Sequence, residues 1–118
     1  MKILKILFLA VNWRVSLLKA FQDVKTHSKL PLQLIAADSD MLAPALNIAD
    51  ESHCLPLFSD NSCLESILTI CKTQDVDAII PLSNNAIDFL DKYREELTNK
   101  NWRLFIQESH TIQICHDK

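Results

Sequence analysis

The stretch KILFLAVNWRVSLLKAF, residues 5–21, decides how this chain folds. Its first half belongs to a nearly continuous apolar run over residues 3–11, which is typical of a strand covered on both faces of a sheet. Its second half has the apolar spacing of an amphipathic helix over residues 14–25. The side chains expected on the inner side of that helix, or beside it, are Val15, Leu17, Leu18, Phe21 and Val24. A buried strand that runs directly into such a helix predicts an α/β protein.

The same two periods alternate along the rest of the chain. Apolar runs predict further strands over residues 30–38, 53–58, 76–82 and 102–106. Helical spacing predicts helices over residues 62–74 and 84–97, and a last helix that Ser109 caps. This order predicts a single α/β domain over residues 1–118, built in three layers from a five-stranded parallel sheet with helices on both faces.

Local signals refine this outline. Pro56 cannot donate a backbone hydrogen bond, which favours an edge position for the third strand. Ser62 stands three residues before Glu65, which predicts a capping box at the start of the following helix. The segment between the second and third strands predicts only a short turn or helix.

Composition narrows the class of protein. The 118 residues are 48% apolar and 23% charged, with a net charge of −3, which is typical of a globular domain. An acidic balance of this size gives no general attraction to nucleic acid or to an anionic membrane. The apolar N-terminal run ends at Asn12 without a small-residue cleavage site, so we interpret it as a strand and not a signal peptide. We therefore expect a cytoplasmic protein that has no membrane span.

The cysteines carry no metal or disulfide pattern. The four are Cys54, Cys63, Cys71 and Cys115, and no two of them form a C-x-x-C pair. The four histidines add no spacing that would suggest zinc. We expect buried thiols in a reducing compartment and no metal ligands.

Ligand-binding residues are expected in the loops at the carboxyl ends of the strands, because parallel sheets bind ligands there. The predicted loops span residues 11–14, 38–44, 59–61 and 82–85. Arg14, at the start of the first helix, could hold an anion, or it could pair with Asp38. Asp38 and Ser39 could contact a ligand or cap the turn that they begin.

Several familiar chemistries are absent from these loops. The chain has no glycine, so the first loop lacks the fingerprint that lets a backbone approach a dinucleotide. A phosphoacceptor receiver domain needs an acidic pair after the first strand, where this chain has Ala10, Val11 and Asn12. No G-x-S-x-G nucleophile elbow is present. We therefore assign no catalytic residue.

Three motifs occur in order along nearly the whole chain: DSDMLAPAL at residues 38–46, IIPL at residues 79–82 and ICHDK at residues 114–118. Together they resemble the N-terminal, Rossmann-like pre-ATP-grasp domain of ATP-grasp ligases, specifically the carbamoyl-phosphate-synthase large-subunit-like proteins. The family implies an enzyme of three parts that uses ATP and magnesium. Such enzymes activate a carboxylate as an acylphosphate and couple it to an amine.

The resemblance also implies roles for single residues. Lys118 matches a lysine that contacts nucleotide phosphate, and it is the last residue of this sequence. The implied substrate contacts are Arg14, Asp38, Ser39 and Ser83.

Two loops depart from the family pattern. The first loop usually reads glycine-arginine-arginine, and Asn12, Trp13 and Arg14 stand there in this chain. The loop after IIPL usually has an acidic residue and a proline, whereas residues 83–85 read SNN. Loss of the glycine restricts the backbone, and Trp13 fills space that a ligand could use.

The resemblance implies that this chain is a substrate-side and structural domain of a carboxylate–amine ligase. We expect that it is truncated where a missing ATP-grasp region should follow, that it is not catalytically competent alone, and that it holds no ATP or magnesium by itself. The expected partners are that region and a small carboxylate or amine substrate. The alternative is a free-standing module that binds a small anion or forms a homodimer without chemistry. A dinucleotide-binding domain remains as a third interpretation.

Overall fold

The structure is a computed structural model, and it describes residues 3–29, 31–98 and 102–105. These residues form one five-stranded sheet in the order β3-β2-β1-β4-β5, in which every pairing is parallel. The strands are β1 (Leu4–Leu9), β2 (Leu32–Asp38), β3 (Glu51–Cys54), β4 (Ala78–Pro81) and β5 (Arg103–Leu104). The predicted parallel α/β fold is confirmed.

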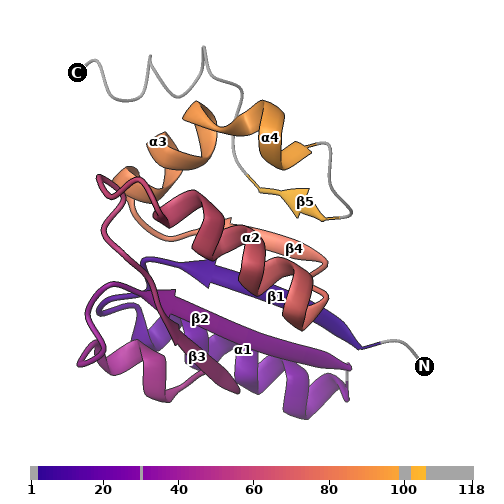
Figure 1. The fold of residues 1–118 in the computed structure, drawn as a ribbon. Coiled ribbons are helices and arrows are strands. Elements are labelled where there is room, and N and C mark those ends of the chain that lie inside the picture. Colours follow the sequence, from indigo (N-terminus) through magenta and orange to yellow (C-terminus); the bar gives the residue numbers. More distant parts are fainter. Residues whose placement is uncertain (1–2, 30, 99–101, 106–118) are drawn as a thin grey trace, which may run out of the picture.

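Helices cover both faces of this sheet (Figure 1). One face carries α1 (Val15–Ser28) and the short 3-10 helix η1 (Pro44–Asn47). The other face carries α2 (Cys63–Gln74), α3 (Asn84–Lys92) and α4 (Arg94–Thr98). The strands between them need apolar side chains on both faces, which accounts for the continuous apolar run over residues 3–11.

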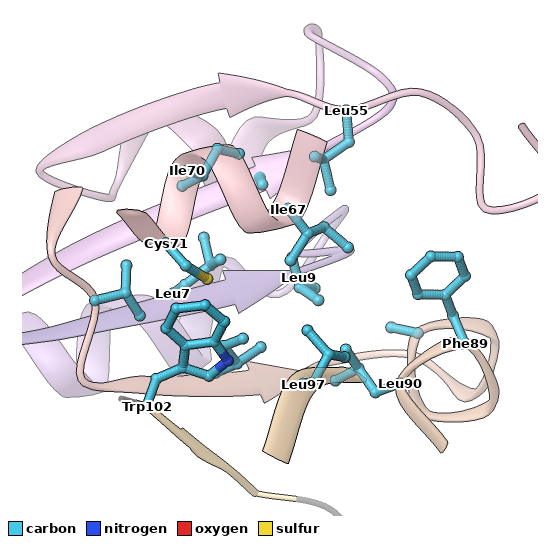
Figure 2. Close-up of a cluster of buried hydrophobic side chains, with 14 of the residues drawn as sticks. Leu7, Leu9, Leu55, Ile67, Ile70, Cys71, Phe89, Leu90, Leu97 and Trp102 are labelled. Carbon is cyan, nitrogen blue, oxygen red and sulfur yellow. The ribbon is translucent and has the colours of Figure 1, made fainter. Parts of the chain in front are cut away.

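Strand β1 lies at the centre of the sheet and contributes side chains to two separate hydrophobic cores. Leu7 and Leu9 point toward α2, where Figure 2 shows them beside Ile67 and Cys71. Their neighbour Phe8 points to the opposite face and meets the ring of Phe21 from α1 edge-on, with 5.1 Å between ring centroids. Successive residues of a strand face opposite sides, so one short strand supports both layers.

Two predicted boundaries are wrong. The third strand runs over Glu51–Cys54 and not over residues 53–58, so the apolar segment that follows lies in a loop. Pro56 cannot donate to a strand ladder, and β3 does occupy the predicted edge. The helix predicted over residues 84–97 is broken at Tyr93, whose φ of −108° and ψ of 26° leave the helical region and separate α3 from α4.

The predicted capping box at Ser62 is also wrong. Ser62 has the helical angles φ −86° and ψ −5°, and its side chain caps no backbone group of α2. Its hydroxyl instead donates to Asp60 Oδ1 at 2.7 Å, and its backbone N–H donates to the same oxygen at 2.8 Å. These bonds lower the pKa of Asp60. The Asp60 carboxylate therefore fixes Ser62 just before α2.

Four described residues adopt the left-handed backbone that usually favours glycine. They are Ala10 (φ 59°), Asn12 (φ 43°), Lys29 (φ 52°) and Asp75 (φ 57°). Lys29 and Asp75 directly follow α1 and α2, at the position where helices commonly end in glycine. A chain without glycine must use other residues there, at a cost of roughly 1–2 kcal/mol each.

Asp50 ties α1 to the outer half of the sheet. Its carboxylate accepts hydrogen bonds from Leu34 N–H at 2.8 Å, Lys25 Nζ at 2.9 Å and Gln22 Nε2 at 3.2 Å. Burial raises the pKa of Asp50, but these bonds together lower it below its usual value. Asp50 therefore joins one helix and one strand through a charged group.

Some predictions fall outside the described residues. The helix that Ser109 was expected to begin lies there, as do Cys115 and Lys118. Within the part that is described, none of the helices has the length and apolar character needed to cross a membrane.

Candidate functional site

A groove of about 1320 Å³ lies at the carboxyl ends of the strands. Its walls come from the segments after β1, β2, β3 and β4 and from the first turns of α1 and α3. Strand β1 has β2 on one side and β4 on the other, so strand order reverses here. This is the place where open parallel sheets bind their ligands. All four residues predicted to contact substrate line it: Arg14, Asp38, Ser39 and Ser83.

Arg14 is the residue before α1, and its guanidinium has no partner among the described residues. Its side chain is exposed and lines the groove. Among residues 3–29, 31–98 and 102–105, no ion pair or side-chain hydrogen bond is formed by Arg14, so the pairing with Asp38 that the sequence left open is not seen. A guanidinium in this setting can bind a carboxylate through two parallel hydrogen bonds.

Asp38 ends β2 and is only 8% exposed. Its Oδ2 accepts the backbone N–H of Asn12 at 2.8 Å, and its Oδ1 accepts that of Asp40 at 2.9 Å. Both bonds use the carboxylate to hold loop backbone, which is the capping role that the sequence offered as one alternative. The side chain nevertheless reaches the wall of the groove.

The two serines differ in their surroundings. Ser83 caps α3, and its Oγ accepts the N–H of Ala86 at 3.1 Å. The hydroxyl proton of Ser83 is left to donate to a ligand, since the capping bond uses only a lone pair of the oxygen. Ser39 is exposed and follows β2 directly. Each can therefore offer one donor to the groove.

The corner after β1 holds no glycine, and one of its backbone donors is already used within the protein. Asn12 occupies the left-handed conformation that usually favours glycine. Asparagine is one of the few residues with a side chain that tolerates this conformation. Its N–H, however, is already donated to Asp38. A backbone donor that a phosphate would need is therefore committed within the protein.

One wall of the groove is apolar, and sequence reasoning missed most of it. Trp13 is 75% exposed and Leu57 is 63% exposed, and both line the groove with Leu17. Deeper in the wall, Phe58 and Phe89 pack with 5.0 Å between ring centroids. The residues after β3 that line the groove are 55–59, and not the predicted 59–61, because the strand ends earlier than its apolar run. The sequence feature that could have indicated this wall is the apolar segment LPLF at residues 55–58.

The described residues contain no group of three or more histidine, cysteine or acidic side chains placed to hold a metal ion. Burial raises the pKa of Cys63 to about 11, with a contribution from Asp60, and that of Cys71 to about 12. Both are buried thiols, as expected. Cys54 is exposed, which corrects the expectation for that residue.

The model of the PylC-like N-terminal domain family matches residues 6–105. Among solved structures, glycinamide-RNase-transformylase T from Mycobacterium tuberculosis matches 95% of this chain at 17% identity, with a TM-score of 0.65. N5-carboxyaminoimidazole synthetase from Staphylococcus aureus, solved with ADP, matches 96% at 16% identity, with a TM-score of 0.57. The biotin carboxylase domain of the 2-oxoglutarate carboxylase from Hydrogenobacter thermophilus, solved with MgADP and bicarbonate, matches 96% at 14% identity, with a TM-score of 0.56.

These likenesses to solved structures establish the fold. The chain spans 31%, 26% and 25% of the lengths of the three structures. Comparison with curated proteins gave no match. The resemblance to the N-terminal domains of ATP-grasp ligases is confirmed at the level of family and fold. The chain belongs to the PylC-like N-terminal domain family.

Proposed function

We propose that this domain forms the substrate side of an ATP-dependent carboxylate–amine ligase. The observation that carries the proposal is that Arg14, Asp38, Ser39 and Ser83, from three different loops, line one groove where strand order reverses. Family membership supports the same assignment. In this proposal the domain binds and orients substrate, and the acyl-transfer chemistry takes place against another part of a longer protein.

Each residue has a role set by its surroundings. The unpaired guanidinium of Arg14 binds the substrate carboxylate. Ser39 and Ser83 donate hydroxyl hydrogen bonds to polar groups of the substrate. Asp38 does not contact the substrate itself. Its two hydrogen bonds to backbone N–H groups fix the loops that carry Arg14 and Ser39. It is thus a positioning residue in this proposal.

The N–H of Asn12 is donated to Asp38, so it is not available to a phosphate of ATP. ATP and magnesium would therefore bind to other parts of a longer enzyme. Lys118 stays a candidate contact for nucleotide phosphate, on the strength of the ICHDK motif alone. The same proposal includes two further points. The ligase is similar to carbamoyl-phosphate-synthase large-subunit-like proteins, and it is located in the cytoplasm.

A second candidate is a module that binds a small anion and does no chemistry. The unpaired, exposed Arg14 favours it, because a guanidinium binds phosphate as readily as carboxylate. The two candidates differ in the anion that they select.

A thermal-shift series on this chain tests the proposal. The probes are propionate, the amino acids, inorganic phosphate and magnesium–ATP, each with the wild-type chain, Arg14→Gln and the control Lys19→Gln, an exposed cation on α1. A ligand at 100 times its Kd stabilises the fold by about 2.7 kcal/mol. We expect a carboxylate to raise Tm in the wild-type chain and in Lys19→Gln but not in Arg14→Gln, and magnesium–ATP to have little effect. An equal response to phosphate would favour the anion module, and a response that survives Arg14→Gln would overturn both.

A further inference from the structure

We infer that the substrate carries a bulky apolar body beside its carboxylate, and that Trp13 determines specificity for that body. This inference rests on the proposed function and deepens it. It starts from two consecutive residues that line the groove: the exposed aromatic Trp13, and Arg14, whose guanidinium has no partner among the described residues.

Packing in the core does not account for a tryptophan at position 13. An indole that is 75% exposed contributes little to either core, and it is in neither of the two buried clusters. A large apolar side chain that stays exposed in the lining of a concave site is typical of a contact surface for a ligand. The indole also lines the same groove as the guanidinium.

The apolar surface continues beyond Trp13. Leu17, one turn further along α1, is 38% exposed, and Leu57, after β3, is 63% exposed. Both line the groove, and the pair of rings Phe58 and Phe89 extends the wall. Three elements that are distant in sequence thus present apolar side chains to one space. Burial of such a surface against a ligand contributes about 25 cal/mol for each Å² removed from water.

The groove lining holds two cations, Arg14 and Lys92, and they differ in their surroundings. Lys92 lies with its ammonium 5.3 Å from the ring centroid of Tyr93. Asp38 is bonded to loop backbone, and Asp88 also has an interaction partner. Arg14 remains without a partner among the described residues, and it lies beside the apolar wall. A molecule with a carboxylate at one end and an apolar body at the other matches both features.

The size of the groove agrees with such a molecule. Its volume of about 1320 Å³ exceeds the range of roughly 300–1,000 Å³ that is typical of small-molecule pockets. A simple carboxylate would leave most of it filled with water, whereas a ligand with a sizeable apolar body would fill more of it.

The test measures the contributions of the apolar body and of the carboxylate to binding separately. Three probes are titrated into the chain by calorimetry: 3-phenylpropionate, propionate, which lacks the ring, and phenethylamine, which replaces the carboxylate with an amine. We expect 3-phenylpropionate to bind about tenfold or more tightly than either of the others, a difference of about 1.4 kcal/mol or more. Trp13→Ala should abolish the advantage over propionate, and Trp13→Phe should retain most of it.

The matched control is Leu42→Ala, because Leu42 is 88% exposed and lies outside the groove lining. This variant should bind all three probes as the wild type does, and circular dichroism confirms that each variant is folded. Equal affinities for propionate and 3-phenylpropionate, both lost in Arg14→Gln, would overturn the role of Trp13 and leave the proposed function standing. Binding of phenethylamine as tight as that of 3-phenylpropionate, insensitive to Arg14→Gln, would overturn both.

Discussion

The backbone N–H of Asn12 donates to Asp38 Oδ2 at 2.8 Å, and this bond joins the corner after β1 to the end of β2. The two residues are 26 positions apart in the sequence. Asp38 holds Asp40 N–H with its other oxygen, so one carboxylate sets two of the loops that line the groove. In a chain without glycine, a loop of the groove is thus held by a side chain.

We expect Asp38→Ala to destabilise the fold by about 2 kcal/mol, since it leaves two backbone donors without their charged acceptor. Asp40→Ala is the control, because the carboxylate of Asp40 accepts the N–H of Leu42 in an exposed turn. Urea unfolding measures the difference. Equal losses of less than about 0.5 kcal/mol in both variants would contradict the structural role given to Asp38.

The fold could be predicted from sequence because the buried part of β1, residues 6–9, is apolar at every position and contributes to two cores. Leu7, Phe8 and Leu9 are all fully buried, and only a strand covered on both faces requires this. Once the alternation of strands and helices is recognised, topology alone brings the loops together at one edge. Arg14 and Ser83 could therefore be assigned to the same site although 69 positions separate them (83 − 14 = 69).

The predictions that were wrong concern loop paths and hydrogen bonds, which the spacing of apolar residues does not determine. The segment after β3 is as apolar as a strand, and only the loop path puts Leu57 into the groove. Asp60 and Ser62 are both residue types that suit the start of a helix. The sequence does not reveal that the Ser62 hydroxyl donates to the Asp60 carboxylate and so is not free to cap α2. The 75% exposure of Trp13, which lies in the loop before α1, is not revealed by any periodicity.

Asp50 should make stability depend on acid pH. Its pKa is lowered in the folded state, because hydrogen bonds from Leu34, Lys25 and Gln22 outweigh the opposing effect of burial. The unfolded chain therefore binds this proton at a higher pH than the folded protein does. The contribution of Asp50 is complete above its usual pKa of 3.8 and is lost as the pH falls through the lower folded value.

Urea unfolding across this acid range measures the effect. We expect Asp50→Asn to be less stable than the wild type at neutral pH and to lose less stability on acidification. Asp23→Asn, at an exposed position on α1, should keep the slope of the wild type. An unchanged slope in Asp50→Asn would show that the carboxylate gains nothing from its three donors.

Asp75 tests the cost of a fold without glycine. It follows α2 with φ 57°, in the left-handed region, and its N–H bonds to Cys71 O. Asp75→Gly removes the steric cost of that conformation, and we expect a gain of about 0.5–1 kcal/mol after the entropy cost of glycine. Asp75→Ala keeps a Cβ and should give no gain. Thermal unfolding compares the three proteins, and equal effects of glycine and alanine would refute backbone strain as the cause.

The described thiols should differ sharply in reactivity. Burial raises the pKa of Cys63 to about 11, with the charge of Asp60 adding to the rise, and burial raises that of Cys71 to about 12. Only the thiolate reacts with iodoacetamide, so at neutral pH these two thiols are both shielded and protonated. Exposed Cys54 should therefore be alkylated first among the three. Peptide mapping after a timed reaction measures each site separately, and urea should make all three react alike. Fast labelling of Cys71 in the folded protein would mean that the core beneath α2 opens readily, contrary to the packing of Leu7 and Ile67 against it.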